Sequence, residues 1–167
     1  MKYRTMGSLD WRVSALGFGC MRLPQRRLNR LRADTQESTT LIRYGIDMGI
    51  NYIDTAWVYH LGDSEKLLGH ALREGYRERV FLTTKLPVFL VRDETDFDKY
   101  LNKQLERLQT DYLDMYLFHG LNASSFEKVK RLGLLDKMEE AKRDGRIRKI
   151  GFSFHDTLPV FKEILGY

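Results

Sequence analysis

Four side chains that can exchange protons or carry charge stand at or near the ends of short apolar segments. Asp54 follows the apolar run 51–53, Lys85 ends the run 79–85, and His119 ends the run 112–119. Tyr59 comes five residues after Asp54, so these two side chains can meet only if the chain turns directly after Asp54. If the apolar runs are neighbouring parallel strands, an acid, an amine, an imidazole and a phenol converge on one rim.

Each of these residues has an ordinary structural interpretation when it is taken alone. Asp54 would be a turn former, Lys85 a solvated charge and His119 a histidine satisfied within the fold. One titratable residue at each of three consecutive strand ends is a much rarer pattern. We therefore interpret the set as functional.

The chemistry that these residues could perform together is proton transfer to a carbonyl oxygen. A free phenol is a weak acid at neutral pH, and a neighbouring Lys85 ammonium would strengthen Tyr59 by stabilising the phenolate. Asp54 would hold Lys85 charged and oriented, while His119 would hydrogen-bond the carbonyl oxygen. No good nucleophile stands beside its own base, which argues against acyl transfer. Asp54 and His119 are too few for a catalytic metal, and we predict no metal site.

The elements that must position these residues follow a repeating pattern. Apolar strands begin near residues 15, 51, 80, 112 and 147, at intervals of roughly 30 to 36 residues, the length of a βα unit. Right-handed crossovers then predict an α/β fold with a parallel sheet and helices outside it. We expect the (β/α)8 TIM-barrel type, with only the first five βα units and an N-terminal β-hairpin in residues 2–14. Because a closed barrel has eight units, residues 1–167 are expected to form a single, incomplete domain.

An open five-stranded sheet of the flavodoxin type is the structural alternative. It predicts a phosphate-binding glycine-rich loop after the first strand, and the segment 16–21 has too few glycines and no Ser/Thr cluster for that role. The arginine-rich segment that follows, 22–32, has no clear periodicity. We interpret it as a solvated loop, with a phosphate or acidic-partner contact as the alternative. Helical spacing predicts helices over residues 35–48, 64–72, 95–108, 134–141 and 158–165.

Composition narrows the class of protein. Hydrophobic residues make up 43% of the chain and charged residues 31%, as in globular proteins. The net charge of +5 is not organised into a basic stripe with aromatic residues, so we expect no nucleic-acid partner. Cys20 is the single cysteine, which excludes an internal disulfide. With no leader-like N-terminus and no long apolar run, the chain is expected to be cytoplasmic and not membrane-bound.

The motifs that contain these residues resemble those of the aldo-keto reductase family. The match includes Gly49–Tyr59 with the following Ser64-Glu65, and the strand-end residues Lys85 and His119. Further matching segments cover most of the chain: Val13–Gly19, Asp111–Asp114 and Lys149–Ser153.

The resemblance implies a TIM-type barrel that binds NADPH, with NADH as an alternative donor, and reduces aldehydes or ketones by hydride transfer. Tyr59 would be the general acid, tuned by Lys85 and Asp54, and His119 would orient the carbonyl. The small-molecule substrate would contact a pocket containing Trp57, Leu86 and Phe89. The nicotinamide half of the cofactor would lie along Gly19, Cys20, Met21, Asp54 and Ser153.

Two departures from the family pattern qualify this expectation. The fifth strand ends in Ser153-Phe154, where the family usually has Ser-Asn, so either the nicotinamide is anchored differently or His155 takes part. The motifs Met21–Pro24 and Phe152–Asp156 resemble those of a subgroup with a C-terminal iron–sulfur region. That region would lie outside these residues.

The second departure is length, because the last three barrel strands and most cofactor contacts would lie beyond residue 167. A homo-oligomer or a partner chain would then cover the open barrel edges. The alternative function is a non-catalytic or regulatory barrel fragment that needs such a partner. A third interpretation, an open-sheet flavin or nucleotide module, predicts a bound flavin.

Overall fold

The fold is built around one parallel sheet. The computed structural model describes residues 1–26 and 29–167, and the side chains of residues 27–31 fall outside that description. Five strands lie side by side in the order β3-β6-β7-β8-β9, and every neighbouring pair is parallel. Their bounds are β3 (Phe18–Gly19), β6 (Tyr52–Asp54), β7 (Phe81–Leu86), β8 (Leu113–Leu121) and β9 (Ile147–Phe154).

This strand order decides between the two architectures expected from the sequence. Each strand lies next to its successor in the chain, so the order never reverses. A flavodoxin-type sheet contains such a reversal, whereas a (β/α)8 barrel adds each strand beside the previous one. The βα pattern is therefore that of a barrel, of which five consecutive strands are present.

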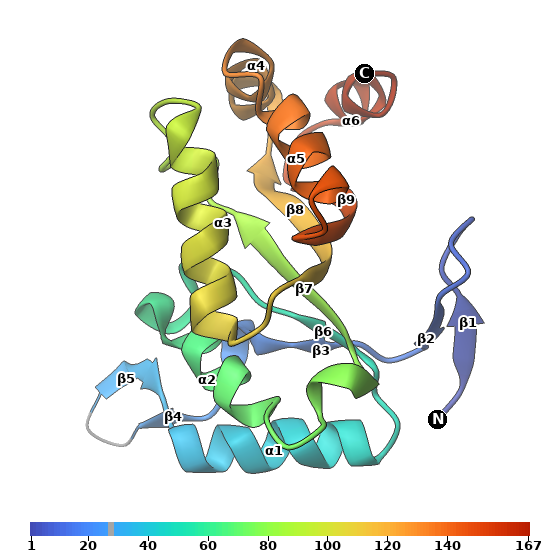
Figure 1. Cartoon of the computed structure of the whole chain (residues 1–167), viewed down its shortest axis with the longest axis vertical. Coiled ribbons are helices and arrows are strands. Elements are labelled where there is room, and N and C mark those ends of the chain that lie inside the picture. The colour runs from blue at the N-terminus through green and yellow to red at the C-terminus, as the bar shows by residue number, and fades with distance from the viewer. Residues whose placement is uncertain (27–28) are drawn as a thin grey trace.

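Helices connect the parallel strands and pack against the sheet (Figure 1). They are α1 (Thr35–Asp47), α2 (Asp63–Ala71), α3 (Thr95–Leu108), α4 (Ala123–Arg131), α5 (Leu134–Arg143) and α6 (Leu158–Leu165). Helix α3 shows why they form: Phe97, Leu101 and Leu108 recur at helical spacing and are fully or almost fully buried. In the part of the chain that the structure describes, no helix is both long and apolar enough to cross a bilayer.

Helices α2 and α3 approach each other closely at Gly69. A Cβ atom at this position would lie 2.5 Å from the backbone oxygen of Arg107. Only glycine fits this contact, because the neighbouring atoms are backbone and cannot rotate away. The close packing brings the last turn of α2, which contains Gly69, against the last turn of α3, which contains Arg107 and Leu108.

The predicted N-terminal hairpin is present and covers the amino ends of the strands. It pairs β1 (Tyr3–Thr5) with β2 (Arg12–Ser14) in antiparallel register. The ring of Trp11 stacks on Phe81 at the start of β7, with 4.6 Å between the ring centroids. Asn51 Nδ2 donates to the Arg12 carbonyl oxygen at 2.9 Å. The opposite, carboxyl ends of the strands carry the proposed site.

Two sequence expectations need correction. The first barrel strand, expected to begin near residue 15, is only Phe18–Gly19, and a 3-10 turn, η1 (Cys20–Arg22), follows it. The arginine-rich segment is not a simple loop, because β4 (Gln25–Arg26) and β5 (Asn29–Ala33) form a small antiparallel pair within it. The part of that expectation that concerns Arg27 lies outside the described residues.

Helix α4 was missed altogether. Its buried apolar residues are only Phe126 and Val129, which are too few to show helical periodicity. Its start is marked instead by a reciprocal capping box, in which Asn122 Oδ1 accepts from Ser125 N and Ser125 Oγ accepts from Asn122 N, each at 2.9 Å. The α4 start closes one side of a groove on the rim.

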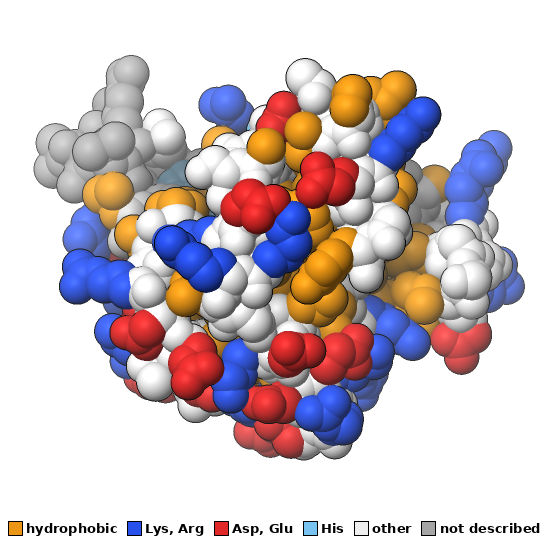
Figure 2. All heavy atoms as spheres, turned by 90° about the horizontal axis from the view of Figure 1, so that it is seen from above, with side chains coloured by type: hydrophobic (Ala, Val, Ile, Leu, Met, Phe, Trp, Pro, Cys, Tyr) orange, Lys and Arg blue, Asp and Glu red, His pale blue; other side chains and the backbone are white. Residues whose placement is uncertain are grey.

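The two edge strands of the sheet, β3 and β9, differ in length. Strand β3 pairs with β6 through only two residues, whereas β9 is eight residues long and pairs with β8 on one side. Beside β9, helix α6 has no buried residue, and Leu158, Leu165 and Tyr167 are largely exposed. Figure 2 shows hydrophobic side chains exposed among charges of both signs on the face seen from above. The β9 edge is therefore the longer open edge of the sheet, and exposed apolar residues of α6 lie beside it.

Candidate active site

Lys85 stands at the centre of the carboxyl rim and is almost fully buried, with 4% of its surface exposed. Its Nζ donates to Asp54 Oδ1 at 2.6 Å and to the Thr55 carbonyl oxygen at 2.8 Å. It also donates to the phenol oxygen of Tyr59 at 3.2 Å. These contacts use all three hydrogens of the ammonium group. The charge of Lys85 is therefore fixed in direction, and one of its hydrogens is aimed at the Tyr59 oxygen.

Asp54 lies at the end of β6, where it is the register partner of Gly19 on β3 and of Thr83 on β7. Burial raises the pKa of its carboxyl group, and the charge of Lys85 and the hydrogen bond from it oppose that rise. The side chain keeps 31% of its surface exposed, so one edge of the carboxylate faces the rim. Asp54 thus serves as the counter-charge of Lys85 while remaining reachable from the rim.

A turn at 56–59, in which Tyr59 N donates to the Ala56 carbonyl oxygen at 3.2 Å, returns Tyr59 to Lys85, and a sharper turn follows at 60–62. His60 and Leu61 adopt the left-handed conformation, with φ values of 51° and 57°, and Gly62 follows with φ 87°. Two consecutive non-glycine residues in this region are strained and persist only where neighbouring contacts hold them. One such contact is visible, because His60 Nε2 accepts a hydrogen bond from Leu23 N at 3.1 Å. The turn at 56–59, directly after Asp54, is the condition under which Asp54 and Tyr59 were expected to meet.

His119 lies near the end of β8 and faces Tyr59. Their rings meet edge to face, with centroids 5.9 Å apart. Burial, followed by the charges of Lys85 and His155, lowers the pKa of His119 to about 4. The imidazole is therefore neutral at neutral pH. Its Nδ1 is buried and has no hydrogen-bond partner among the described residues, so this polar atom is left unsatisfied within the fold.

All four predicted catalytic residues therefore lie at one rim. The structure brings Asp54, Tyr59 and Lys85 into direct hydrogen-bond contact and places His119 against the ring of Tyr59. In the described part of the chain, no group of three or more His, Cys, Asp or Glu side chains is arranged to hold a metal ion. The arrangement can hold a proton on a phenol next to a fixed positive charge, which is suited to protonating a carbonyl oxygen.

A buried polar network between α2, α3 and β7 contacts the backbone of Lys85. Its role was not predicted from the sequence. Glu65 on α2 is fully buried and accepts from Thr84 Oγ1 at 2.7 Å and from Arg107 Nη1 at 3.0 Å. Gln104 Nε2 donates to Glu65 Oε1 and to the Lys85 carbonyl oxygen. The hydroxyl of Tyr116 donates to Gln104 Oε1 at 2.6 Å.

One signal in the sequence points to this network. Gln104 occupies the same helical stripe as Phe97, Leu101 and Leu108, where an apolar residue is the ordinary choice. A polar residue in such a stripe must find partners inside the protein. Its partners on α2 and β8 could not be inferred, because they depend on how the helices cross.

The predicted cofactor residues lie on both sides of the tetrad. Gly19 is beside Asp54 in register, Cys20 is fully buried with a thiol pKa raised mainly by burial, and Met21 is largely exposed. Ser153 lies on β9, where its Oγ accepts a hydrogen bond from Gly120 N at 2.8 Å. Ser153 is thus tied to the residue that follows His119.

Room for a ligand exists near these residues. Gly19 and Gly120 both have open space where a Cβ atom would stand, with no atom within 4 Å. These openings leave space for a flat, polar ring such as a nicotinamide. The residues present are therefore compatible with the predicted cofactor.

The three predicted pocket residues behave differently. Phe89 is 57% exposed, and its ring centroid lies 6.1 Å from that of His119, so it can form a wall of the site. Trp57 is held between the Arg107 guanidinium, 3.6 Å from its ring centroid, and the edge of Tyr100. Leu86 needs correction: it is fully buried in the core, and a residue packed on all sides cannot line a pocket.

Comparison with known proteins identifies the family. Residues 15–164 match the sequence profile of the aldo/keto reductase family. The chain belongs to that family. The methylglyoxal reductase YeaE of Escherichia coli is 38% identical over 112 residues, which are 67% of this chain and 37% of that protein.

Solved structures of the family superpose on nearly the whole chain. The holo form of an aldo-keto reductase from Bacillus halodurans gives a TM-score of 0.82 at 32% identity, covering 99% of this chain and 54% of that one. An aldo/keto reductase from Klebsiella pneumoniae in complex with NADP and acetate gives 0.75 at 30% identity, covering 92% and 50%. This chain spans less than half of the length of four curated relatives that it matches.

Proposed function

We propose that this chain carries the proton-delivering site of an NADPH-dependent oxidoreductase that reduces an aldehyde or ketone, with Tyr59 as the general acid. The observation that carries the proposal is the bond from Lys85 Nζ to the phenol oxygen of Tyr59 at 3.2 Å. Because that oxygen accepts a hydrogen bond, its own hydrogen is free to point at a ligand. The names of the Escherichia coli relative and of the NADP complex from Klebsiella pneumoniae support the proposal.

Each of the four residues would have a distinct role. Tyr59 gives its proton to the carbonyl oxygen, and the adjacent Lys85 ammonium stabilises the phenolate that remains. Asp54 holds Lys85 in place through the 2.6 Å contact. His119 is neutral at neutral pH because its pKa is lowered to about 4, so it can donate a hydrogen bond that orients the carbonyl.

NADPH, when bound, supplies the hydride for the carbonyl carbon, and NADH is the alternative donor. We propose that the nicotinamide half of the cofactor lies along the carboxyl rim. The residues of this chain that would hold it are Gly19, Cys20, Met21, Asp54 and Ser153. The openings at Gly19 and Gly120 support this placement. The cytoplasmic location and the C-terminal iron–sulfur region stay predictions from the sequence.

The decisive test replaces Tyr59 with phenylalanine, which removes the proton donor and keeps the ring. We expect the rate of NADPH oxidation with simple aldehydes to fall by about 10²- to 10⁴-fold, the usual contribution of a general acid. The absorbance of the reduced nicotinamide measures that rate. Tyr44→Phe is the matched control, because Tyr44 is an exposed tyrosine of α1 and takes no part in the hydrogen bonds of the rim described above. Equal rates for the wild type and Tyr59→Phe would remove Tyr59 from the mechanism.

A second candidate is a non-catalytic or regulatory barrel that a partner completes. The chain exposes 9541 Å², whereas a folded monomer of this mass exposes roughly 8,600 Å². A protein interface of standard size covers about 800 Å² on each partner, close to that excess. The long β9 edge is where a further strand from a homo-oligomer or another chain would pair.

Cofactor binding separates the two candidates. Titration of the chain with NADPH, followed by nicotinamide fluorescence, is expected to show saturable binding for the reductase. Sedimentation velocity on the same sample measures whether the chain is a monomer. Absence of NADPH binding by a well-folded chain would favour the non-catalytic candidate.

A further inference from the structure

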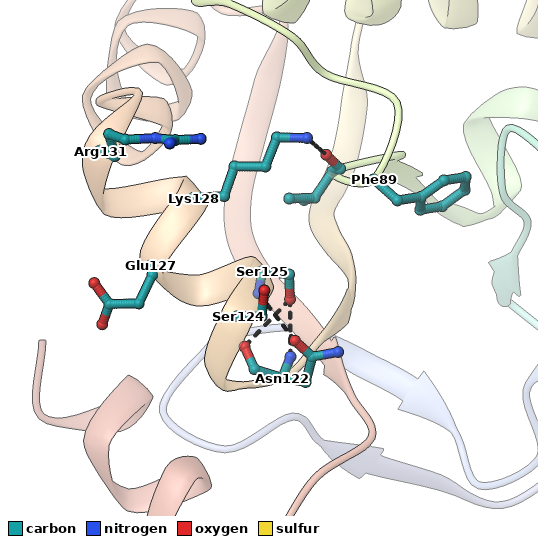
Figure 3. Close-up of a pocket in the computed structure, with 8 residues that line it drawn as sticks. Phe89, Asn122, Ser124, Ser125, Glu127, Lys128 and Arg131 are labelled. Carbon is teal, nitrogen blue, oxygen red and sulfur yellow. Dashed lines mark hydrogen bonds between the residues drawn. The ribbon is translucent and has the colours of Figure 1, made fainter.

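A groove of about 620 Å³ lies beside the proposed active site, between the loop that follows β7 and helix α4 (Figure 3). Its lining includes Val88 and Phe89 on one side and Asn122, Ser124, Lys128 and Arg131 on the other. Neither Tyr59 nor Lys85 belongs to this lining. The groove is therefore a separate space from the site of proton transfer, and none of the roles assigned above uses it.

The charge in this groove is positive and incompletely neutralised. Lys128 Nζ donates to the Val88 carbonyl oxygen at 2.8 Å, a neutral partner that leaves its charge uncompensated. Arg131, one helical turn further along α4, forms no ion pair with the described residues. The acidic residue of the lining, Glu127, is paired with Lys130 and points away from Lys128 and Arg131 in Figure 3. Two cations thus share one wall without an acid between them.

At the other end of the groove, where α4 begins, a carboxylate already accepts a hydrogen bond from the helix. Asp156 Oδ2 accepts from Ala123 N at 2.9 Å, at the first turn of α4, and Asn122 Oδ1 accepts from Ser125 N. These oxygens accept hydrogen bonds from backbone N–H groups that would otherwise bind an anion at the start of the helix. An anionic ligand is therefore favoured at the Lys128 and Arg131 end of the groove.

Phe89 connects the groove to the proposed active site. It lines the groove, and its ring is 6.1 Å from that of His119. Figure 3 shows the ring turned away from Lys128 and Arg131, so Phe89 lines the groove while its ring faces His119. A ligand whose carbonyl group lies at His119 would pass along an exposed aromatic surface before it reaches the two cations.

We propose that this groove binds the anionic end of the substrate, so that the preferred substrates are carbonyl compounds bearing a carboxylate beyond an apolar spacer. The substrate class rests on the proposed reductase function. Arg131 can bind a carboxylate through two parallel hydrogen bonds, and Lys128 adds a point charge beside it. The apolar spacer lies against Phe89.

The test compares an acid with its neutral ester. The probes are 4-carboxybenzaldehyde and methyl 4-formylbenzoate, and the dissociation constant of each is measured by NMR from the amide shifts of the α4 residues. In the wild type the acid is expected to bind at least about tenfold more tightly than the ester, as for a charge-assisted contact. In the double variant Lys128→Gln/Arg131→Gln the two constants are expected to become equal, with ester binding unchanged.

A matched variant controls for overall charge. Lys142→Gln/Arg143→Gln removes the same two charges from the last turn of α5, outside the groove, and is expected to keep the preference for the acid. Loss of the preference in this control, or no preference in the wild type, would overturn the groove assignment.

Turnover of the same two aldehydes separates this inference from the proposed function. Reduction of both with equal kcat/KM would leave the reductase in place and overturn the inference. Selective binding of the acid with no NADPH oxidation would overturn the proposed function and leave the anion site standing.

Discussion

Two buried charge clusters lie at opposite ends of the same strands, and they differ in how completely their atoms are paired. At the amino ends, Asp114 accepts from Arg77 Nη2, Leu82 N and Arg148 Nη1, each at 2.9 Å. Both arginines also pack on the ring of Tyr112, at 4.2 and 3.9 Å from its centroid. The Asp114 carboxylate and the Arg77 guanidinium are thus fully paired, while the Arg148 side chain, 52% exposed, reaches the solvent.

The cluster at the carboxyl ends is equally buried at its centre but is not closed. Lys85 has used all its donors, yet the hydrogen of the Tyr59 phenol and the Nδ1 of His119 have no partner among the described residues. A completely paired cluster stabilises the fold, whereas an incompletely paired one can exchange its missing bonds for those of a ligand. The two clusters are therefore distinguished by their unpaired atoms more than by their buried charge, and the unpaired atoms lie in the candidate functional cluster.

The largest effect is expected from breaking the cluster at the amino ends. Asp114→Ala leaves Arg77 buried without its counter-charge, and removing one partner of a buried ion pair destabilises by about 3–5 kcal/mol. Urea denaturation measures this loss in the free energy of unfolding. Asp54→Ala is the counterpart at the rim, and we expect a smaller loss there because 31% of the Asp54 side chain is exposed. Equal losses would contradict the contrast between the two clusters.

A somewhat smaller effect is expected from lowering the pH. The pKa of His119 falls from 6.5 to about 4 on folding, so the unfolded chain binds a proton more readily than the folded chain. Stability should therefore decline as the pH falls below 6.5, with the full penalty reached below about 4, and a shift of this size costs at most about 3 kcal/mol. The free energy of unfolding, measured from pH 7 to pH 4 and compared with His119→Gln, isolates this contribution.

The control for that titration is His70→Gln, which removes an exposed histidine of α2. The control should keep the wild-type dependence on pH, whereas His119→Gln should flatten it. A wild type and a His119→Gln variant with the same pH dependence would show that His119 is not the group that resists protonation.

The smallest effect concerns the link between β9 and His119. Ser153→Ala removes the acceptor of Gly120 N and should cost about 1 kcal/mol of unfolding free energy. Because Gly120 follows His119, the imidazole should also become less well fixed, and an NMR titration should show its pKa moving from about 4 toward the ordinary value. Ser153→Thr keeps the hydroxyl and is expected to restore the wild-type titration. An unchanged imidazole in Ser153→Ala would limit Ser153 to a local structural role.

The parts of the site that were predictable from the sequence follow from strand periodicity. Asp54, Lys85 and His119 each end an apolar run, and parallel strands bring such ends together regardless of the details of packing. The barrel order of the strands was likewise implied by the regular βα spacing. Leu86 was misassigned because a residue at a strand end faces either the rim or the helices, and its position in the alternation turned it into the core.

The parts that could not be predicted depend on contacts between elements distant in the sequence. Glu65 lies in the first turn of α2, where an acid ordinarily faces solvent and interacts with the helix dipole, yet it is a buried partner of Arg107 on α3. That contact exists because Gly69 allows the two helices to approach, a distance that neither helix encodes alone. The groove beside α4 could not be predicted for a related reason. The apolar residues of α4 are too few to show helical periodicity, so the helix itself was not recognised.

The three hydrogen bonds of Lys85 have one further consequence, which concerns the energy of reorganisation. In water, dipoles must rotate when charge moves between a phenol and a carbonyl, and that rotation is part of the barrier. Here the ammonium is already directed at the Tyr59 oxygen, while Asp54 and the Thr55 carbonyl prevent it from turning. A charge that develops on that oxygen would meet an electric field oriented during folding rather than during the reaction.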